Sequence, residues 1–172
     1  MKNIQIVVAM FLSIFSLGQV SIGKDKVNGS ATILDFNETN NTRGIILSAV
    51  NNVSNALATV STNNNGTFLL DKSDNKIKMY ENNVWVALSN VGDSSNAFTN
   101  TTAEIGEGIT IGSETTQSKG VLVLESDNKA MILPKIANPH TTVKSPYPGM
   151  ICYDTVSKAL AVFDGKVWNY WK

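Results

Sequence analysis

Cysteine is almost absent from this sequence of 172 residues, since Cys152 is the only one. No disulfide bond can form within the chain, although small exported domains often depend on such cross-links. Histidine is equally scarce, because His140 stands alone. A metal site built from several histidines is therefore impossible within one chain. The chain must gain its stability from packing, either inside one molecule or between molecules.

An excess of charge of either sign is missing too. The 14 basic residues balance the 14 acidic ones, and only 16% of the residues are charged. Lysine and arginine form no block, so the electrostatic signature of a nucleic-acid-binding protein is absent. The glycines of "IGEGITIG" do not match a phosphate-binding pattern. We expect no nucleic-acid partner and no cofactor.

No group of residues has the pattern of a catalytic site. His140 lies in the proline-rich segment "NPHTTVKSPYPG", where a solvated loop histidine is favoured over a catalytic one. Cys152 has apolar neighbours and no basic residue beside it, which predicts an inert buried thiol. Asp71 and Asp154 each begin a turn, and aspartate favours turns by hydrogen bonding to the following backbone. We predict that the protein is not an enzyme and binds no metal.

The first residues have the pattern of an export signal. Lys2 provides a positive start, and an apolar run extends from Ile4 to Leu17. Ser16 and Gly18 then place small residues where a signal peptidase cuts. The run is shorter than the roughly 20 apolar residues that a transmembrane helix needs. We predict a cleavable signal peptide and a protein that is secreted or held at the cell surface.

Two copies of one unit follow the signal. "GTFLLDKSDNKIKMYENNVWVAL" in the first copy matches "GMICYDTVSKALAVFDGKVWNYW" at the end of the chain without a gap. The match pairs Gly66 with Gly149 and Trp85 with Trp168. "RGIILSAV" is echoed by "KAMILPKI" in the same order. An internal repeat of this kind decides how the whole fold is interpreted.

The repeat defines the predicted organisation of the chain. The segment between the copies is rich in Ser, Thr, Asn and Gly and poor in large apolar residues, which is typical of a linker. The predicted parts are a signal peptide over 1–18, a first β-repeat over 19–88, a linker over 89–108 and a second β-repeat over 109–172.

Short β-type runs and turns dominate each copy. Residues 68–70, 77–80 and 84–88 are predicted strands of the first copy, and residues 31–36 and 120–125 are predicted strands nearer the start of each copy. The Asp-Gly pair of the second copy predicts a type I′ hairpin turn, since glycine tolerates positive φ. The predicted fold class is mainly β, with two tandem repeats of short strands and hairpins.

Each copy has a size at which stability alone is marginal. A unit of roughly 60–70 residues buries a small fraction of its surface, so it is expected to need further support. Disulfides and metal clusters are missing, and short meanders leave strand edges that need cover. Packing of the copies on one another or association of chains can supply the missing burial, which favours a homo-oligomer.

Both copies contain motifs that carry a family resemblance. "SIGKDKVNGSATILDFNETNNTRGIIL" and "TIGSETTQSKGVLVLESDNKAMILPKI" are each followed by a glycine, an apolar-aspartate turn and a tryptophan. In these motifs the chain resembles exported β-repeat proteins of Bacteroidota, which are tail-fibre- or adhesin-like. The resemblance implies a secreted or surface fibre-type protein that forms a trimer. The first copy departs from the motif at Ser48, where the second copy has Pro134.

The aromatic residues are the best candidates for contacts. Trp85 and Trp168 recur at one position of the repeat, so a core or interface role is favoured over sugar stacking. Tyr170 and Trp171 have no aromatic counterparts in the first copy, which makes them the first place to look for a ligand.

The predicted function is that of an exported structural or adhesive surface protein of fibre type, acting through oligomerisation and surface contacts. Its expected partners are further copies of itself, as a trimer, and a surface glycan or protein. The alternative is a secreted carbohydrate-binding module that uses the C-terminal aromatics. Trp85, Trp168, Tyr170 and Trp171 are the ligand or interface candidates.

Overall fold

The computed structural model describes residues 18–56, 62–99, 101–102 and 108–172. Within these ranges short strands dominate, together with two single-turn 3₁₀ helices and one short α-helix. The mainly β fold is therefore confirmed. The predicted signal peptide lies outside the described residues, except for its last position.

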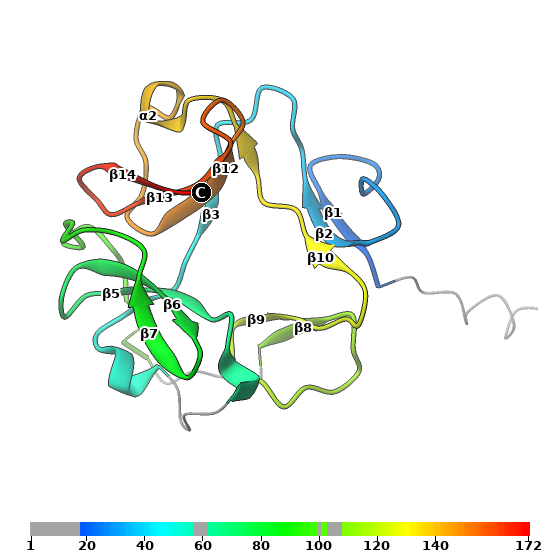
Figure 1. The fold of residues 1–172 in the computed structure, drawn as a ribbon, viewed down its shortest axis with the longest axis horizontal. Helices are drawn as coiled ribbons and strands as arrows, with labels where there is room; N and C mark the ends of the chain where they lie inside the picture. Colours follow the sequence, from blue (N-terminus) through cyan, green and yellow to red (C-terminus); the bar gives the residue numbers. More distant parts are fainter. Residues whose placement is uncertain (1–17, 57–61, 100, 103–107) are drawn as a thin grey trace, which may run out of the picture.

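The same series of strands occurs twice along the chain (Figure 1). The first copy contains β1 (Val20–Ile22), β2 (Thr32–Phe36), β3 (Ile45–Ile46), β4 (Ala49–Val50), β5 (Phe68–Asp71), β6 (Lys76–Glu81) and β7 (Val84–Ala87), with 3₁₀ turns at Val53–Asn55 and Thr62–Asn64. The second contains β8 (Ile109–Ile111), β9 (Leu122–Leu124), β10 (Ala130–Met131), β11 (Lys135–Ile136), α2 (Pro139–Thr142), β12 (Met150–Asp154), β13 (Ala159–Phe163) and β14 (Trp168–Trp171).

The pairing of the strands repeats as well. Each copy begins with a parallel pair, β1 with β2 and β8 with β9. Each ends in an antiparallel meander, β5–β6–β7 or β12–β13–β14, with a short parallel strand at its edge. Phe68 faces Met79 in the first meander, and their counterparts Ile151 and Val162 face each other in the second. The two tandem repeats of short strands are confirmed, whereas the boundaries predicted for repeats and linker stay predictions.

The two copies are interlocked. β3 of the first copy pairs in antiparallel fashion with β12 of the second, where Ile45 faces Ile151. β10 of the second copy pairs in parallel with β2 of the first, where Met131 faces Leu34. Figure 1 shows β10 beside β2 and β3 close to β12. Each copy therefore completes a sheet of the other.

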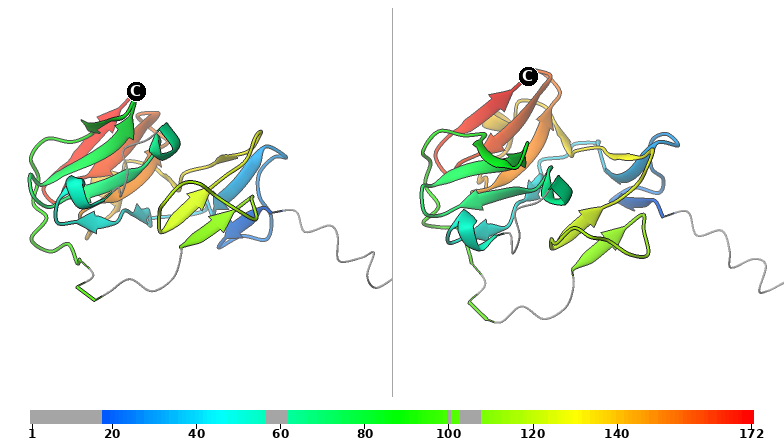
Figure 2. Two further views of the ribbon diagram at one scale, coloured as in Figure 1. Left: turned by 90° about the horizontal axis from the view of Figure 1, so that it is seen from below. Right: turned by 60° about the horizontal axis from the view of Figure 1, so that its bottom comes forward.

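The main core lies where the two meanders meet. Each meander has one apolar face, and stacking the two faces removes both from water (Figure 2). The buried members of this core are Leu70, Ile77, Leu88, Ala97, Ile151 and Val162. A smaller cluster around Ile136, Cys152 and Ala161 also includes half-buried Val143 and Trp168. The meanders thus form the dense part of the molecule.

The segment that follows β7 packs against both meanders. Its Gly92 N–H donates to the carbonyl of Asn75 at 2.8 Å, and its Asp93 N–H donates to the carbonyl of Asp164 at 2.8 Å. The backbones approach so closely that a Cβ on Gly92 would collide with the Asp164 carbonyl, and one on Gly165 with the Asp93 carbonyl. Glycine is required at both positions because nothing larger fits.

A type I′ turn is present in the first copy. Asn82 and Asn83 alone connect β6 to β7, and both have positive φ, 49° and 63°. Two residues at positive φ define this turn, and asparagine is one of the few side chains that tolerates the conformation. The two asparagines thus form the type I′ turn in the first copy, whereas the sequence predicts this turn at Asp-Gly in the second copy.

The predicted type I′ turn at Asp164 and Gly165 is wrong. Phe163 faces Trp168, so four residues connect β13 to β14. Asp164 Oδ1 accepts hydrogen bonds from the backbone N–H groups of Lys166 and Val167 at 2.8 Å each. This carboxylate holds a wider loop open, which the dipeptide pattern alone does not reveal.

Candidate interaction surface

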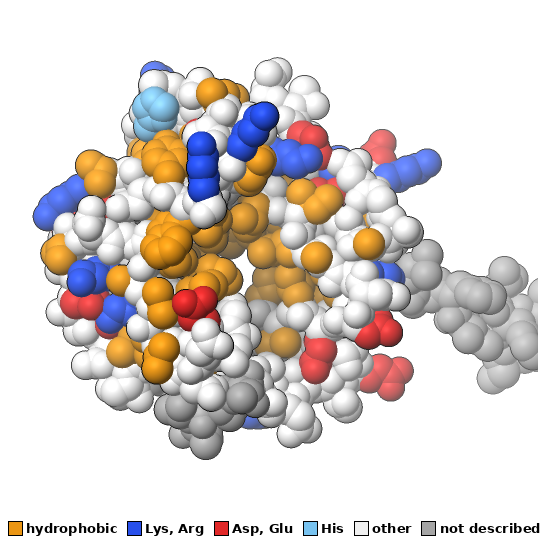
Figure 3. All heavy atoms as spheres, viewed as in Figure 1, with side chains coloured by type: hydrophobic (Ala, Val, Ile, Leu, Met, Phe, Trp, Pro, Cys, Tyr) orange, Lys and Arg blue, Asp and Glu red, His pale blue; other side chains and the backbone are white. Residues whose placement is uncertain are grey.

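Exposed apolar side chains lie on or directly beside the short strands that precede the meander of each copy. Seven large ones are between 36% and 66% exposed: Val20, Ile22, Ile46, Ile109, Val121, Leu122 and Met131. We refer to these seven residues as the apolar strand surface. Figure 3 shows hydrophobic side chains around a hollow between the meanders and the parallel strand pairs. Concentrated exposed apolar groups are typical of interaction sites.

Equivalent strands of the two copies differ in exposure. Leu34 in β2 is 2% exposed, whereas Leu122, its counterpart in β9, is 46% exposed. β2 has a neighbour on both edges, β1 on one and β10 on the other. Among the described residues β9 pairs with β8 alone. Leu34 and Leu122 are the same residue type, so the side chain does not explain the difference. We attribute the exposure of Leu122 to the missing second neighbour of β9.

The short strand β3 also has an open edge. It is the first-copy counterpart of β10, which pairs with β2. Within the described ranges β3 pairs with β12 on one side and with no other strand. Ile46 on this strand is 52% exposed. Unpaired edges offer free N–H and C=O groups to a strand from another chain.

Trp85 and Trp168 lie at matching places in the two meanders, as the repeat predicts. Trp85 packs on Tyr80 with ring centroids 5.1 Å apart, and Trp168 packs on Phe163 at 5.4 Å. Both tryptophans are half-buried. Tilted contacts of this kind stabilise each meander. Their role as ligand or interface residues stays a prediction.

Trp171 joins the end of the chain to the first copy. Its indole Nε1–H donates to the carbonyl of Leu88 at 2.6 Å, while its side chain remains 43% exposed. The Asn90 N–H donates to Asn169 Oδ1 at 3.2 Å in the same place. These residues line a shallow hollow together with Ala87, Ser89 and Tyr170. The ring is thus held in position beside an open surface.

Tyr170 pairs with the single histidine. Its hydroxyl lies 3.1 Å from His140 Nδ1, and the two rings meet edge to face. Burial raises the pKa of the Tyr170 phenol, and the charge of Asp154 adds to the rise. The phenol therefore stays protonated at neutral pH, and the pair forms an exposed polar contact.

Cys152 is fully buried in β12. Burial, with a contribution from the Asp154 charge, raises the pKa of its thiol to about 12. The reactive thiolate is therefore almost absent at neutral pH. The side chain serves the smaller core cluster, as an apolar group would.

The two aspartates that recur in the repeat are buried and hydrogen-bonded. Asp71 Oδ1 accepts from the Ser73 N–H at 2.9 Å, and Asp154 Oδ1 accepts from the Val156 N–H at 3.0 Å. The prediction that both begin turns is confirmed. The Lys78 ammonium bridges Asp71 and Asp74 at 2.7 Å each, so a cation of the protein itself occupies the polar end of this loop.

These hydrogen bonds decide the charge of the carboxylates. Burial by itself would raise the pKa of Asp71, but hydrogen bonds from Lys78 and Ser73 outweigh it and hold the pKa below its usual value. The pKa of Asp35 is lowered against burial by Lys24 and by backbone N–H groups. The carboxylates are therefore ionised structural acceptors. In the described part of the chain, no group of three or more His, Cys, Asp or Glu side chains could hold a metal ion.

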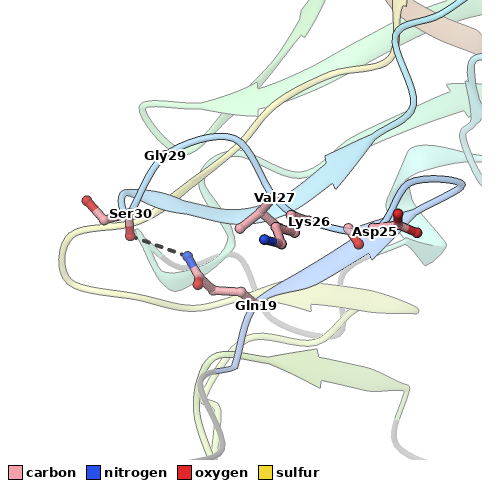
Figure 4. A pocket seen from close by; sticks show the side chains of 7 residues that line it. Gln19, Asp25, Lys26, Val27, Gly29 and Ser30 are labelled. Atoms are coloured by element: carbon pink, nitrogen blue, oxygen red, sulfur yellow. Dashed lines mark hydrogen bonds between the residues drawn. The ribbon is translucent and has the colours of Figure 1, made fainter.

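An open hollow lies beside the loop between β1 and β2 (Figure 4). The Gln19 side-chain amide reaches across it and donates to the carbonyls of Thr32 at 2.6 Å and Ser30 at 3.4 Å. Asp25 and Lys26 supply one charge of each sign to its rim. The hydrogen bonds of Gln19 join the start of β1 to β2. The hollow that they cross is not a second apolar site.

The apolar strand surface escaped prediction from the sequence, which directed attention to the aromatics. One signal was available, since β9 reads Leu-Val-Leu and β3 reads Ile-Ile, without the polar residues of a half-exposed strand. Their exposure could not be foreseen, because it depends on which strands pair. No helix among the described residues is long and apolar enough to cross a membrane.

Comparison with known protein families finds a similarity in the second copy. Residues 110–172 match the family described as the phage tail like trimerisation region. This range begins in β8 and includes the rest of the second copy, with its open strand β9. No curated protein and no solved structure matches the chain. The second copy is thus similar to a trimerisation region of the phage-tail type, which supports a fibre-type structural protein that acts through homo-oligomerisation as a trimer.

Proposed function

We propose that this protein is an exported, non-enzymatic structural protein of fibre type that works as a homotrimer at the cell surface or in the medium. One observation carries the proposal. The region similar to phage-tail trimerisation regions is the copy whose strands β8 and β9 leave apolar side chains in water. A trimer would cover these side chains, whereas a monomer leaves them exposed.

The energetics favour association. Ile109 in β8 is 63% exposed, and Val121, directly before β9, is 66% exposed. The β8–β9 pair has no further strand among the described residues. A two-stranded sheet is marginal by itself in water. Burial of each such side chain contributes about 1–2 kcal/mol. If each chain of a trimer buries such side chains, the summed free energy of burial is larger than the small stability of an isolated strand pair. The strand pair would then be stabilised mainly by association.

Export and surface location are part of the proposal. The apolar run from Ile4 to Leu17, followed by small residues, supports export. The resemblance to exported β-repeat proteins of Bacteroidota points the same way. We expect N-terminal sequencing of the exported protein to begin at Gln19. A protein that starts at Met1 and stays inside the cell would contradict export but leave the trimer untouched.

The chemistry of the side chains supports a role without catalysis. The Cys152 thiol is buried and protonated, and the buried aspartates already accept hydrogen bonds from the protein. His140 contacts a tyrosine hydroxyl on the surface. The work of the protein would then come from its shape and its contacts.

Solution mass tests the proposal directly. The full chain, purified after export, should have the mass of a trimer by light scattering coupled to size exclusion, and keep it over a hundredfold dilution. Association that is driven by apolar burial should also persist at high salt, because apolar contacts are not screened. A compact monomer at every concentration would contradict the fibre-type function.

A second candidate function is glycan binding by the C-terminal aromatics. Tyr170 is 40% exposed and Trp171 is 43% exposed beside a hollow that Asn90 and Asn169 help to line. Aromatic faces next to amides are suited to sugar rings. Trp171→Ala should abolish binding on a glycan array and leave the trimer intact if this function holds, with Val167→Ala as the control. Loss of the trimer instead would assign Trp171 to assembly.

A further inference from the structure

The two copies of one chain contribute different strands to the contact between them. The first copy contributes β2 and β3, whereas the second contributes β10 and β12. By the repeat, β10 is the counterpart of β3, and β12 is the counterpart of β5. The two copies therefore use different faces. A contact between different faces can be repeated by further units until the assembly closes.

The strands that one copy uses in this contact have counterparts on the other copy that take no part in it. The second copy retains β9 and β10, the counterparts of β2 and β3. The first retains β3 and β5, the counterparts of β10 and β12. In the described ranges β9 has one free edge, and β4 covers only the Leu70 and Asp71 part of β5. The corresponding place on β12, at Met150 and Ile151, is filled by β3.

We propose that neighbouring chains repeat this contact, so that β9 and β10 of one chain pair with β3 and β5 of the next. β9 and β3 are parallel with Leu122 opposite Ile45, as Leu34 is opposite Met131 within one chain. β10 and β5 are antiparallel with Met131 opposite Phe68, as Ile45 is opposite Ile151 within one chain. The inference rests on the proposed trimer and supplies its strand register.

The composition of the open strands supports this pairing. β9 reads Leu-Val-Leu and β3 reads Ile-Ile, with no charged residue and no proline. An edge that stays solitary in water usually carries charges or proline that prevent pairing. Leu122 is 46% exposed and Ile46 is 52% exposed, so both strands have apolar area to bury. Three chains joined in this way form a ring of six alternating copies.

A charge on the β9 edge tests the pairing. Leu122→Lys places an ammonium on a sheet face that pairing with β3 would bury, as Leu34 is buried at 2% exposure in β2, and burial of a charge without a partner is unfavourable. We expect the concentration at which half of the trimer dissociates to rise at least about tenfold. Val167→Lys is the matched control, because Val167 is 55% exposed in a loop of the second meander. That variant should assemble as the unmodified chain does.

A cysteine pair tests the register. Ile45→Cys combined with Leu122→Cys should give disulfide-linked trimers on mild oxidation, while Ile45→Cys combined with Val167→Cys should not. The native thiol does not interfere, since Cys152 is buried with a pKa of about 12. Circular dichroism of each variant establishes that it has folded.

The outcomes separate two failures. Trimers that are as stable with Leu122→Lys as without it, or equal cross-linking in both cysteine pairs, would overturn the strand pairing while the trimer stands. An unmodified chain that stays monomeric would overturn the proposed function and this inference with it. Dissociation by Leu122→Lys alone, with cross-linking only in the predicted pair, would support both.

Discussion

The meanders and the parallel strand pairs solve the problem of a small core in different ways. In the meanders Ile77 and Val162 are fully buried, because two apolar faces stack on each other. In the β8–β9 pair Ile109 is 63% exposed and Leu122 is 46% exposed. The apolar core between the meanders is complete within one chain, whereas β9 has one unpaired edge among the described residues. In the proposed trimer, stability and assembly would therefore depend on different parts of one small protein.

The two parallel pairs sharpen this comparison, since they have the same origin in the repeat. Leu34 and Leu122 are identical in type and equivalent in position, yet one is buried and the other is exposed. β10 accounts for the difference, because it pairs with β2 and not with β9. The environment of a strand is set by its neighbours as much as by its own residues.

The largest expected effect comes from the core of the meanders. Ile77→Ala should lower the free energy of unfolding by about 2–5 kcal/mol, because it leaves a cavity between the stacked faces. Ile109→Ala, at an exposed site of β8, should change it by less than about 0.5 kcal/mol when chains are dilute. Urea denaturation at low protein concentration measures both. Similar losses would remove the distinction between the two regions.

The junction of the meanders should respond next. Gly165 has φ of 98°, and a Cβ there would also meet the Asp93 carbonyl. Gly165→Ala should therefore cost about 2–3 kcal/mol, from strain and collision together. Gly66 is the control, since its φ is 91° but no atom lies within 4 Å of its would-be Cβ. Gly66→Ala should cost only about 1 kcal/mol in thermal or urea unfolding.

Acid should weaken the second meander through its buried Asp154. Burial would raise the pKa of Asp154, but hydrogen bonds from the protein lower it below the usual 3.8. As the pH falls, the unfolded chain therefore binds more protons than the folded chain does. The stability that the ionised Asp154 contributes above pH 4 is lost as the pH drops through the lowered pKa. Asp154→Asn should cost about 1.5–3 kcal/mol at pH 7 and less near pH 3.

The exposed Asp127 provides the comparison for the acid effect. Asp127→Asn should leave the stability unchanged within about 0.5 kcal/mol at either pH. Unfolding curves at pH 7, 5, 4 and 3 measure both variants. A cost of Asp154→Asn that stays constant over this range would mean that the ionised form is not the one stabilised.

The smallest effect concerns matching turns of the two meanders. Asn75 and Lys158 occupy the same turn position with φ of 57° and 55°. Asparagine tolerates this left-handed conformation better than lysine does. Lys158→Asn should therefore stabilise the protein by about 0.5–1 kcal/mol in thermal unfolding, whereas Lys166→Asn, in the neighbouring loop and without positive φ, should not.

Local features of this fold were accessible from the sequence. The strands around residues 68–70, 77–80 and 84–88 were predicted within one or two residues, and the turns that start at Asp71 and Asp154 were predicted correctly. The prediction at Asp164 and Gly165 failed because the Asp164 carboxylate binds two N–H groups and widens the loop. The dipeptide does not encode that choice.

The sequence by itself determined the repeat, the mainly β class and the short strands, because alternation and turn residues act over a few neighbouring positions. Only the tertiary structure decided that β10 covers β2 and β3 meets β12, which leaves β9 open. Strands of two or three residues carry too little information to select a distant partner. Their pairing is settled by how the two meanders stack and where the connecting chain can reach.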